Sequence, residues 1–142
     1  MTAVPSPLPH EANEEIVRRL MDLFATTLHH QASCLEGVGL TYGQAKVLWR
    51  LEPGELLSLK ELARRIGVDP SNAADVVDQL TKRGFVASRR SEHDRRVRLI
   101  RLTAPGIRLR RRLVARMSDH PALESLSRAR RAALLEILRE VA

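Results

Sequence analysis

The sequence predicts a mainly helical, single-domain protein that carries one small β-hairpin. Apolar residues recur at helical spacing through most of the 142 residues, which indicates amphipathic helices. After Gly84 the apolar period changes to two, which is typical of strands. Two short helices with clear start and stop signals precede that change. Because 142 residues is also the length of one domain, we expect a single fold that includes the hairpin.

The first helix is predicted over residues 11–36, and Gly37 with Gly39 ends it. The preceding residues 1–10 contain three prolines and are expected to form a disordered arm. The apolar residues of the helix follow the helical period and form one broad stripe. They are Ile16, Val17, Leu20, Leu23, Phe24 and Leu28.

A second helix is predicted to begin after Thr41. Thr41 and Gln44 have the spacing of a capping box, in which each side chain satisfies a backbone amide near the other residue. Pro53 and Gly54 end this helix, because proline cannot continue it and glycine favours a turn.

Two further short helices are predicted between Ser58 and Gly84. Ser58 and Glu61 repeat the capping-box spacing, and Gly67 ends the helix in the left-handed conformation. Asp69 caps the next helix, which Gly84 ends. The short turn between these two helices matches a helix-turn-helix motif.

The predicted hairpin consists of the β-prone runs 85–90 and 96–102, with a polar turn between them. In the second run apolar and arginine residues occupy both faces, so alternation alone does not identify the buried side. Thr103 is predicted to cap another helix, which residues 119–121 break. A last helix is predicted to begin near Ser127.

The whole chain has a net charge of +7. Its positive charge is concentrated in one block. Residues 82–116 contain thirteen Lys and Arg residues against only Glu92 and Asp94. Nearly all of these bases are arginines, which match phosphate and guanine edges better than lysines do. The aromatic content of 3% is too low for the stacking platforms of single-strand binders. Duplex DNA is therefore the favoured partner.

Three stretches of this region form a pattern that is specific in its spacing. They are the helix-turn-helix residues 62–69, the pattern Leu80-x-x-x-Gly84, and Asp94-x-Arg96-x-x-x-x-x-Leu102-Thr103 followed by Gly106.

With these motifs the chain resembles the MarR (multiple antibiotic resistance regulator) type of winged-helix transcription regulator. The resemblance implies a fold that is mainly α with a small β wing. It places a winged helix-turn-helix DNA-binding lobe at residues 41–102. It also implies dimerisation helices at residues 11–36 and 103–142. The apolar stripes of the first and last helices independently favour a two-fold homodimer, since one small core cannot cover them.

Two predicted elements carry the candidate DNA contacts. Asn and Gln on the second helix of the motif suit the reading of adenine in the major groove. Arginines of the hairpin suit phosphates or a narrow minor groove. Asn72 has an alternative role, which is to hydrogen-bond the start of its own helix. The candidates are Ser71, Asn72, Asp75, Gln79, Lys82, Arg89, Arg90, Arg95 and Arg96.

Two acidic residues lie among these candidates. Because an acid near DNA repels phosphate, we expect Asp94 to hold Arg96 by an ion pair that orients the guanidinium, and the resemblance implies the same pairing. Ala74 and Asp75 depart from the family pattern, in which a threonine and a basic residue are common. Asp75 either accepts from the amino group of a cytosine or suppresses non-specific binding, and we favour the second role.

The resemblance also implies a small organic effector, which we expect near His29, His30, Tyr42 and Trp49. A branch of the family senses peroxides through a lone cysteine early in the first helix, whereas Cys34 lies near the end of that helix. We therefore favour a buried, structural Cys34. No metal and no cofactor is expected, because the grouping of His29, His30, Cys34 and Glu36 lacks a second ligand cluster.

These observations predict a cytoplasmic, homodimeric transcription regulator, in the first instance a repressor. It would bind a pseudo-palindromic duplex site and be released by an effector. It would not be an enzyme, since no catalytic triad, Walker or dinucleotide-binding motif is present. No secretory signal or membrane span is apparent. The alternatives are an architectural DNA-binding protein without an effector, and a repressor that senses redox state through Cys34.

Overall fold

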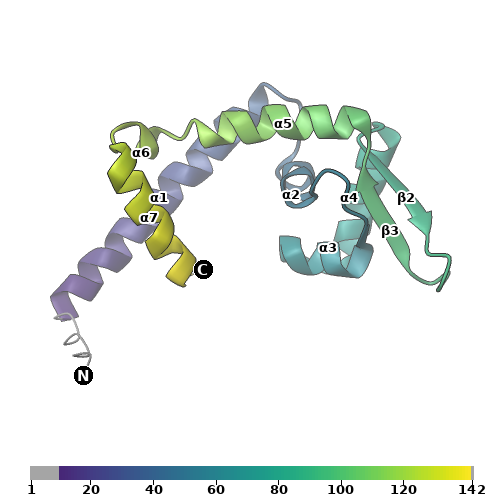
Figure 1. The fold of residues 1–142 in the computed structure, drawn as a ribbon, viewed down its shortest axis with the longest axis horizontal. Helices are drawn as coiled ribbons and strands as arrows, with labels where there is room; N and C mark the ends of the chain where they lie inside the picture. Colours follow the sequence, from purple (N-terminus) through teal and green to yellow (C-terminus); the bar gives the residue numbers. More distant parts are fainter. Residues whose placement is uncertain (1–9, 142) are drawn as a thin grey trace. The chain divides into compact units, whose positions relative to one another are not determined.

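The computed structural model describes residues 10–141, which form two units. Residues 32–118 form the winged-helix unit, and the helical unit consists of the residues before and after them. The fold is mainly α with a small β wing, as predicted (Figure 1), and its antiparallel sheet has three strands. The elements are α1 (His10–Glu36), α2 (Tyr42–Arg50), β1 (Leu57–Ser58), α3 (Leu59–Ile66), α4 (Pro70–Lys82), β2 (Val86–Arg90), β3 (Arg98–Leu102), α5 (Ala104–Ser118), α6 (Pro121–Glu124) and α7 (Arg128–Val141).

The elements differ from prediction at several places, and the second hairpin strand begins at Arg98 instead of residue 96. His10, which was expected in the disordered arm, is the first residue of α1, and the rest of that arm lies outside the described residues. The two-residue strand β1 and the four-residue helix α6 were not predicted. Both are too short to show a hydrophobic period of their own.

The winged-helix unit encloses a continuous hydrophobic core. Helix α2 packs against α3, α4 and α5, and β3 packs against α3 and α5. Leu48, Leu62, Leu80 and Ile100 are inaccessible to solvent at its centre. Leu113 of α5 joins them, although the sequence analysis grouped this helix with the terminal dimerisation helices. Helix α5 therefore contributes to the core that supports α4 and the hairpin.

The predicted caps form at the helix starts, with one difference. The capping box of Thr41 and Gln44 is complete. The Ser58 side chain accepts from the Glu61 backbone amide, but the Glu61 carboxylate pairs with Arg64 and Arg65 instead of returning to the cap. The second capping box is therefore only half formed, because nearby arginines compete for the glutamate.

The sheet has the order β1-β3-β2. Strands β2 and β3 pair from Val86 opposite Leu102 to Arg90 opposite Arg98. Ile100 and Leu102 lie on the buried side of β3, which settles the face that alternation left open. Beyond β3, a Cβ atom on Gly106 would lie 1.9 Å from the carbonyl oxygen of Phe85. A glycine is therefore required where the start of α5 packs against Phe85, the residue before β2.

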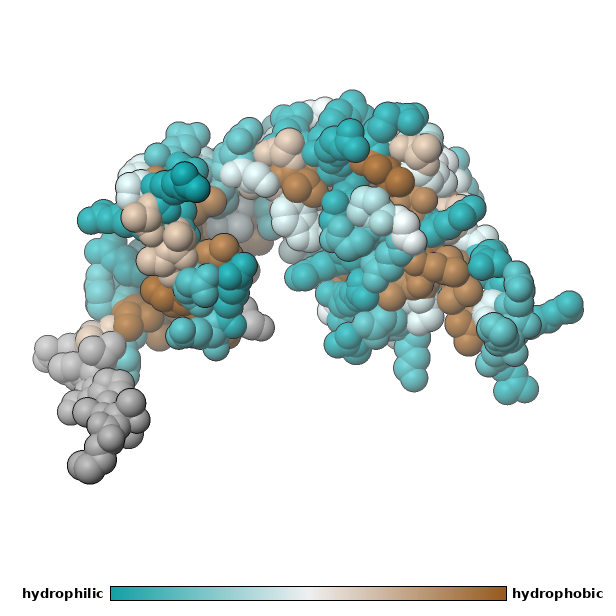
Figure 2. Space-filling model, in the orientation of Figure 1, coloured by the Kyte–Doolittle hydropathy of each residue, from teal (hydrophilic) through white to brown (hydrophobic). Residues whose placement is uncertain are grey.

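The helical unit contains the first part of α1 together with α6 and α7. Of its side chains that the structure describes, none is buried. His120 caps α6, because its Nδ1 accepts from the Ala122 amide at 3.1 Å. Its Nε2 lies 3.1 Å from the Thr27 hydroxyl of α1, and its ring lies edge-on to His30. Apolar side chains are exposed on α1 and α7, and Figure 2 shows them as brown patches.

No helix within residues 10–141 has both the length and the apolar character that a membrane span requires.

Candidate nucleic-acid interface

Helix α4 presents one buried and one exposed face. Ala73, Val77 and Leu80 are buried against the core. The opposite face carries polar side chains, which hydrogen-bonding recognition of a base edge requires. All five predicted contacts of this helix are exposed, namely Ser71, Asn72, Asp75, Gln79 and Lys82.

The first two of these side chains are engaged with the helix start. Ser71 Oγ donates to Asp69 Oδ1 at 2.6 Å, and Asn72 Nδ2 donates to Asp69 Oδ2. The Ser71 hydrogen bond, together with the Asn72 backbone amide, lowers the pKa of Asp69. Asn72 thus makes the local hydrogen bond that the sequence analysis held as its alternative role. In the free protein this holds its side chain at the cap.

An ion pair ties the hairpin to α4. Arg98 of β3 lies 2.6 Å from Asp78 Oδ1 and donates to the Ser88 hydroxyl at 3.1 Å. This pair was not predicted from the sequence, because its partners are 20 residues apart and no local spacing links them. The bond holds the end of the strand pair nearest the turn beside the exposed face of α4.

The turn of the hairpin is shaped by Asp94. Its Oδ1 accepts from the Arg96 backbone amide at 2.9 Å, and its carbonyl oxygen accepts from the Val97 amide at 2.9 Å. The ion pairs within residues 10–141 do not include one between Asp94 and the Arg96 guanidinium. The expected ion pair is therefore wrong for this structure. A carboxylate two residues before an amide instead closes a local turn.

The hairpin arginines differ in how firmly they are held. Arg89 pairs with Glu92 across the turn at 2.9 Å, and both side chains are exposed. Arg90, Arg95 and Arg96 are exposed, and no described acidic side chain pairs with them. These three guanidinium groups can therefore contact DNA phosphates without first breaking an ion pair within the protein.

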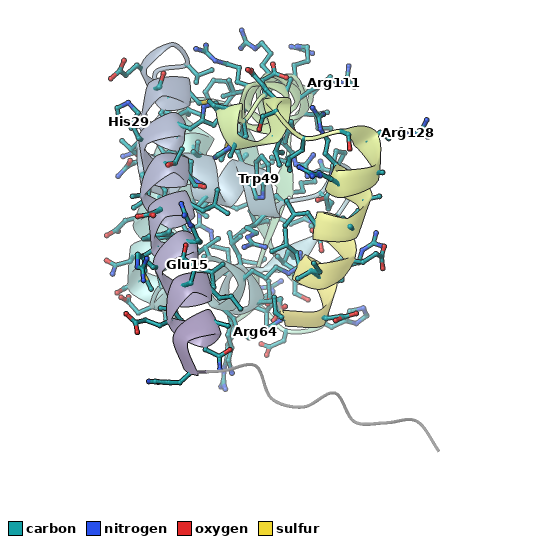
Figure 3. The ribbon with its side chains drawn as sticks, turned by 90° about the vertical axis from the view of Figure 1, so that its left-hand side faces the viewer. Glu15, His29, Trp49, Arg64, Arg111 and Arg128 are labelled. Carbon is teal, nitrogen blue, oxygen red and sulfur yellow. The ribbon has the colours of Figure 1, made fainter. Side chains whose placement is uncertain are left out.

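A second basic surface lies on α5. Arg110 pairs with Glu52 at 2.6 Å and is largely covered. Arg108, Arg111 and Arg112 are exposed and line an open hollow, and Figure 3 labels Arg111 on this helix. Their charge adds to the positive field of the unit.

The residues expected near an effector belong to both units. His29 is exposed on α1 (Figure 3), and His30 packs against His120 with 4.9 Å between ring centroids. Tyr42 and Trp49 lie in the winged-helix unit, where Lys46 Nζ lies 5.5 Å from the Tyr42 ring centroid. Trp49 is half-buried on α2.

Cys34 is buried, with 5% of its surface exposed, and its Sγ donates to the Arg116 carbonyl at 3.4 Å. A thiol in this position is shielded from oxidants in solution, and reactive cysteines are accessible. Among the residues that the structure describes, no three His, Cys, Asp or Glu side chains are grouped to hold a metal.

Comparisons with known proteins agree with this geometry. The model of the MarR family matches residues 40–97. The HTH-type transcriptional regulator SarZ of Staphylococcus haemolyticus is 33% identical over 76 residues, which are 54% of this chain and 52% of SarZ. The chain spans about half the length of such curated relatives.

Solved structures match over nearly the whole chain. The PcaV transcriptional regulator of Streptomyces coelicolor, in complex with its natural ligand, is 30% identical with a TM-score of 0.61, and 99% of this chain and 96% of PcaV are covered. The transcriptional repressor CouR, bound to a 23-mer DNA duplex, is 28% identical with a TM-score of 0.74, and 96% and 99% are covered. CouR of Rhodococcus jostii RHA1 bound to p-coumaroyl-CoA is 26% identical with a TM-score of 0.72, and 91% and 92% are covered. This chain belongs to the MarR family of transcriptional regulators.

Proposed function

We propose that the protein is a homodimeric repressor that binds a pseudo-palindromic site in duplex DNA. Helix α4 would enter the major groove, and the hairpin would contact the neighbouring backbone or minor groove. The observation that carries this proposal is the exposed polar face of α4 beside three hairpin arginines, with which no acidic side chain of residues 10–141 pairs. The DNA-bound relative CouR supports it. A regulator of this kind would act on chromosomal DNA in the cytoplasm.

The helical unit supports the dimer. Phe24 is 59% exposed on α1, and Val141 is 75% exposed on α7. Apolar side chains that a small unit cannot bury within itself mark an interaction surface. A second copy offers the same apolar surface, and a two-fold contact between identical patches is the commonest way to close an oligomer. Two α4 helices would then reach successive major grooves about 34 Å apart.

Titration of a labelled duplex at several salt concentrations tests DNA binding. Six to ten phosphate contacts for each dimer would reduce affinity by about 10³ to 10⁵ between 50 and 200 mM salt. Competition with single-stranded DNA of the same sequence gives the second readout. Affinity that is independent of salt, or a preference for the single strand, contradicts the proposal.

An effector is the second part of the proposal. PcaV is solved with its natural ligand and CouR with p-coumaroyl-CoA, which supports ligand control here. We propose that a small organic molecule binds near His29, His30, Tyr42 and Trp49 and weakens DNA binding. Linkage requires DNA to weaken the effector by the same factor. A scan of small aromatic acids tests this, and equal ligand affinity for free and DNA-bound protein refutes it.

Burial of Cys34 disfavours the alternative of a redox-sensing repressor. Blocking the thiol with a cysteine reagent is expected to leave DNA binding unchanged in the folded protein. Absence of any effector response, combined with DNA binding, would favour the architectural alternative.

Asp75 is exposed on α4, and two roles remain for it. If it accepts from a cytosine amino group, Asp75→Ala weakens binding only to sites with one particular C·G pair. If its charge only opposes phosphate, Asp75→Ala strengthens binding to all sequences alike. We favour the charge role, since a carboxylate facing DNA must overcome the phosphate field. Affinities for the bound site and its single-base variants decide between the roles.

A further inference from the structure

A chain of hydrogen bonds joins the start of α2 to the exposed face of α4. Gln44 lies at its centre and is only 6% exposed. Its Oε1 accepts from the Thr41 backbone amide at 3.2 Å and from Arg83 Nη1 at 2.9 Å. Its Nε2 donates to Gln79 Oε1 at 3.0 Å. A buried side chain thus connects two fixed donors to a side chain that is exposed on α4.

The two ends of the Gln44 amide cannot be exchanged. Its oxygen faces a backbone N–H and a guanidinium, and both groups can only donate. If the amide turned over, its NH2 group would face these two donors, and both partly buried hydrogen bonds would be lost. Arg83 is held in turn by the ring of Phe85, 5.1 Å away. The Gln44 NH2 group must therefore face Gln79.

This orientation determines what Gln79 can offer to a ligand. Because Gln44 is the donor in their hydrogen bond, Gln79 must direct its oxygen toward Gln44. The NH2 group of Gln79 then points away from this bond, with two N–H donors available. A glutamine that reads adenine uses both its oxygen and its NH2 group. In Gln79 the oxygen is already bonded within the protein.

We propose that Gln44 is a positioning residue that makes Gln79 a donor toward the major groove, where it selects a base with acceptors. Guanine fits best, because its N7 and O6 are both acceptors, whereas cytosine presents an amino donor. This inference rests on the proposed role of α4 in DNA binding. It replaces the prediction, made from residue type alone, that Gln79 recognises adenine.

Two isosteric substitutions test the proposal from opposite ends of the bond. Gln44→Glu keeps acceptors for Thr41 and Arg83 but offers Gln79 an oxygen instead of a donor. The Gln79 amide should then turn over and present its oxygen to DNA. Gln79→Glu keeps the bond from Gln44 and presents a carboxylate oxygen directly. Both variants exchange a donor for an acceptor at the same place.

The experiment measures affinities of the full-length chain for its selected duplex and for all single-base-pair variants of that duplex. Comparison with Gln79→Ala identifies the base pair that Gln79 contacts, because this variant no longer distinguishes between bases at that position. At that pair we expect the wild-type chain to favour guanine over cytosine by about tenfold, and both glutamate variants to favour cytosine or adenine. The added negative charge lowers affinity for every duplex, but it leaves the ratio between duplexes unchanged.

Gln44→Met serves as the control, because it keeps the side-chain volume but removes the relay. In this variant the Gln79 amide is free to turn, so the preference for guanine over cytosine should become weaker without reversing. If both glutamate variants fold and keep the wild-type preference, the inference is overturned while the proposed function stands. If Gln44→Glu fails to fold, Gln79→Glu alone decides. If the wild-type chain binds no duplex selectively, the proposed function fails as well.

Discussion

The two units of the molecule differ in how completely they bury their own apolar side chains. In the winged-helix unit Leu48, Leu62 and Leu80 are inaccessible to solvent. In the helical unit the described side chains include none that is buried, and Phe24 and Val141 are among its exposed apolar residues. The first unit can therefore supply its own stability, whereas the second gains hydrophobic stabilisation only when something covers it. In the proposed function, the winged-helix unit recognises DNA and the helical unit assembles the dimer.

The largest effect is expected from a cavity in the winged-helix core. Leu80→Ala removes a fully buried side chain from the inner face of α4 and should lower the free energy of unfolding by about 2–5 kcal/mol. Urea denaturation measures the loss. Leu56→Ala is the matched control, because Leu56 is 41% exposed in the same unit. Equal losses in the two variants would show that the core is not where the stability lies.

Assembly is expected to fail when a charge enters the apolar surface of the helical unit. Phe24→Glu places a carboxylate where the proposed partner copy packs, and a buried unpaired charge is strongly unfavourable. Sedimentation velocity should show a monomer. Circular dichroism should show that the secondary structure is unchanged. Leu56→Glu adds the same charge to an exposed leucine of the other unit and should remain dimeric. A dimeric Phe24→Glu would contradict the division between the units.

A smaller effect is expected at the hairpin. Arg96→Ala should weaken specific DNA binding by about 1–3 kcal/mol and leave the oligomeric state unchanged. Asp94→Ala should also weaken binding, because the turn loses the bond to the Arg96 amide. Asp94→Asn keeps an oxygen for that amide and should bind nearly as well as the wild-type chain. If Asp94→Asn instead binds as poorly as Asp94→Ala, the charge of Asp94 matters and an ion pair forms on DNA.

The smallest effect is a pH dependence within the winged-helix unit. Hydrogen bonds from Arg64 and Arg65 lower the pKa of Glu61 from 4.5 to about 2. Because the folded-state pKa lies below the unfolded value, the stabilisation is complete above pH 4.5 and is lost as the pH falls through about 2. Wild-type and Glu61→Gln proteins should therefore differ in unfolding free energy at pH 6 and converge near pH 2. If the difference in unfolding free energy stays constant across this pH range, the lowered pKa of Glu61 is not its cause. Arg64 is exposed and Glu61 is only partly buried, so the effect is modest.

Features that depend on local spacing were predictable from the sequence. The Thr41 cap, the Gly67 stop and the hairpin all follow from residues within one or two turns of each other. The exposed face of α4 follows from the helical period, since Val77 and Leu80 mark the opposite face.

Features that depend on distant partners were not predictable. Strand β1 exists because Leu57 pairs with Ile100, and Arg98 finds Asp78 only after the hairpin folds back onto α4. The bond between Gln44 and Gln79 spans 35 residues. At the tip of the hairpin the residue was identified but its role was wrong. Asp94 was predicted to hold the Arg96 guanidinium, whereas the folded turn shows it accepting from the Arg96 backbone amide.

Selection of bound sites from random duplex DNA tests the central claim most directly, when it is done with the wild-type chain and with Phe24→Glu in parallel. The wild-type chain should select two inverted half-sites with centres about 10 base pairs apart, as two α4 helices on one face of the duplex require. Phe24→Glu should enrich single half-sites weakly or none at all. A single undivided wild-type site, or the same inverted repeat from both proteins, would contradict the account in which the helical unit assembles the dimer and the winged-helix unit reads DNA.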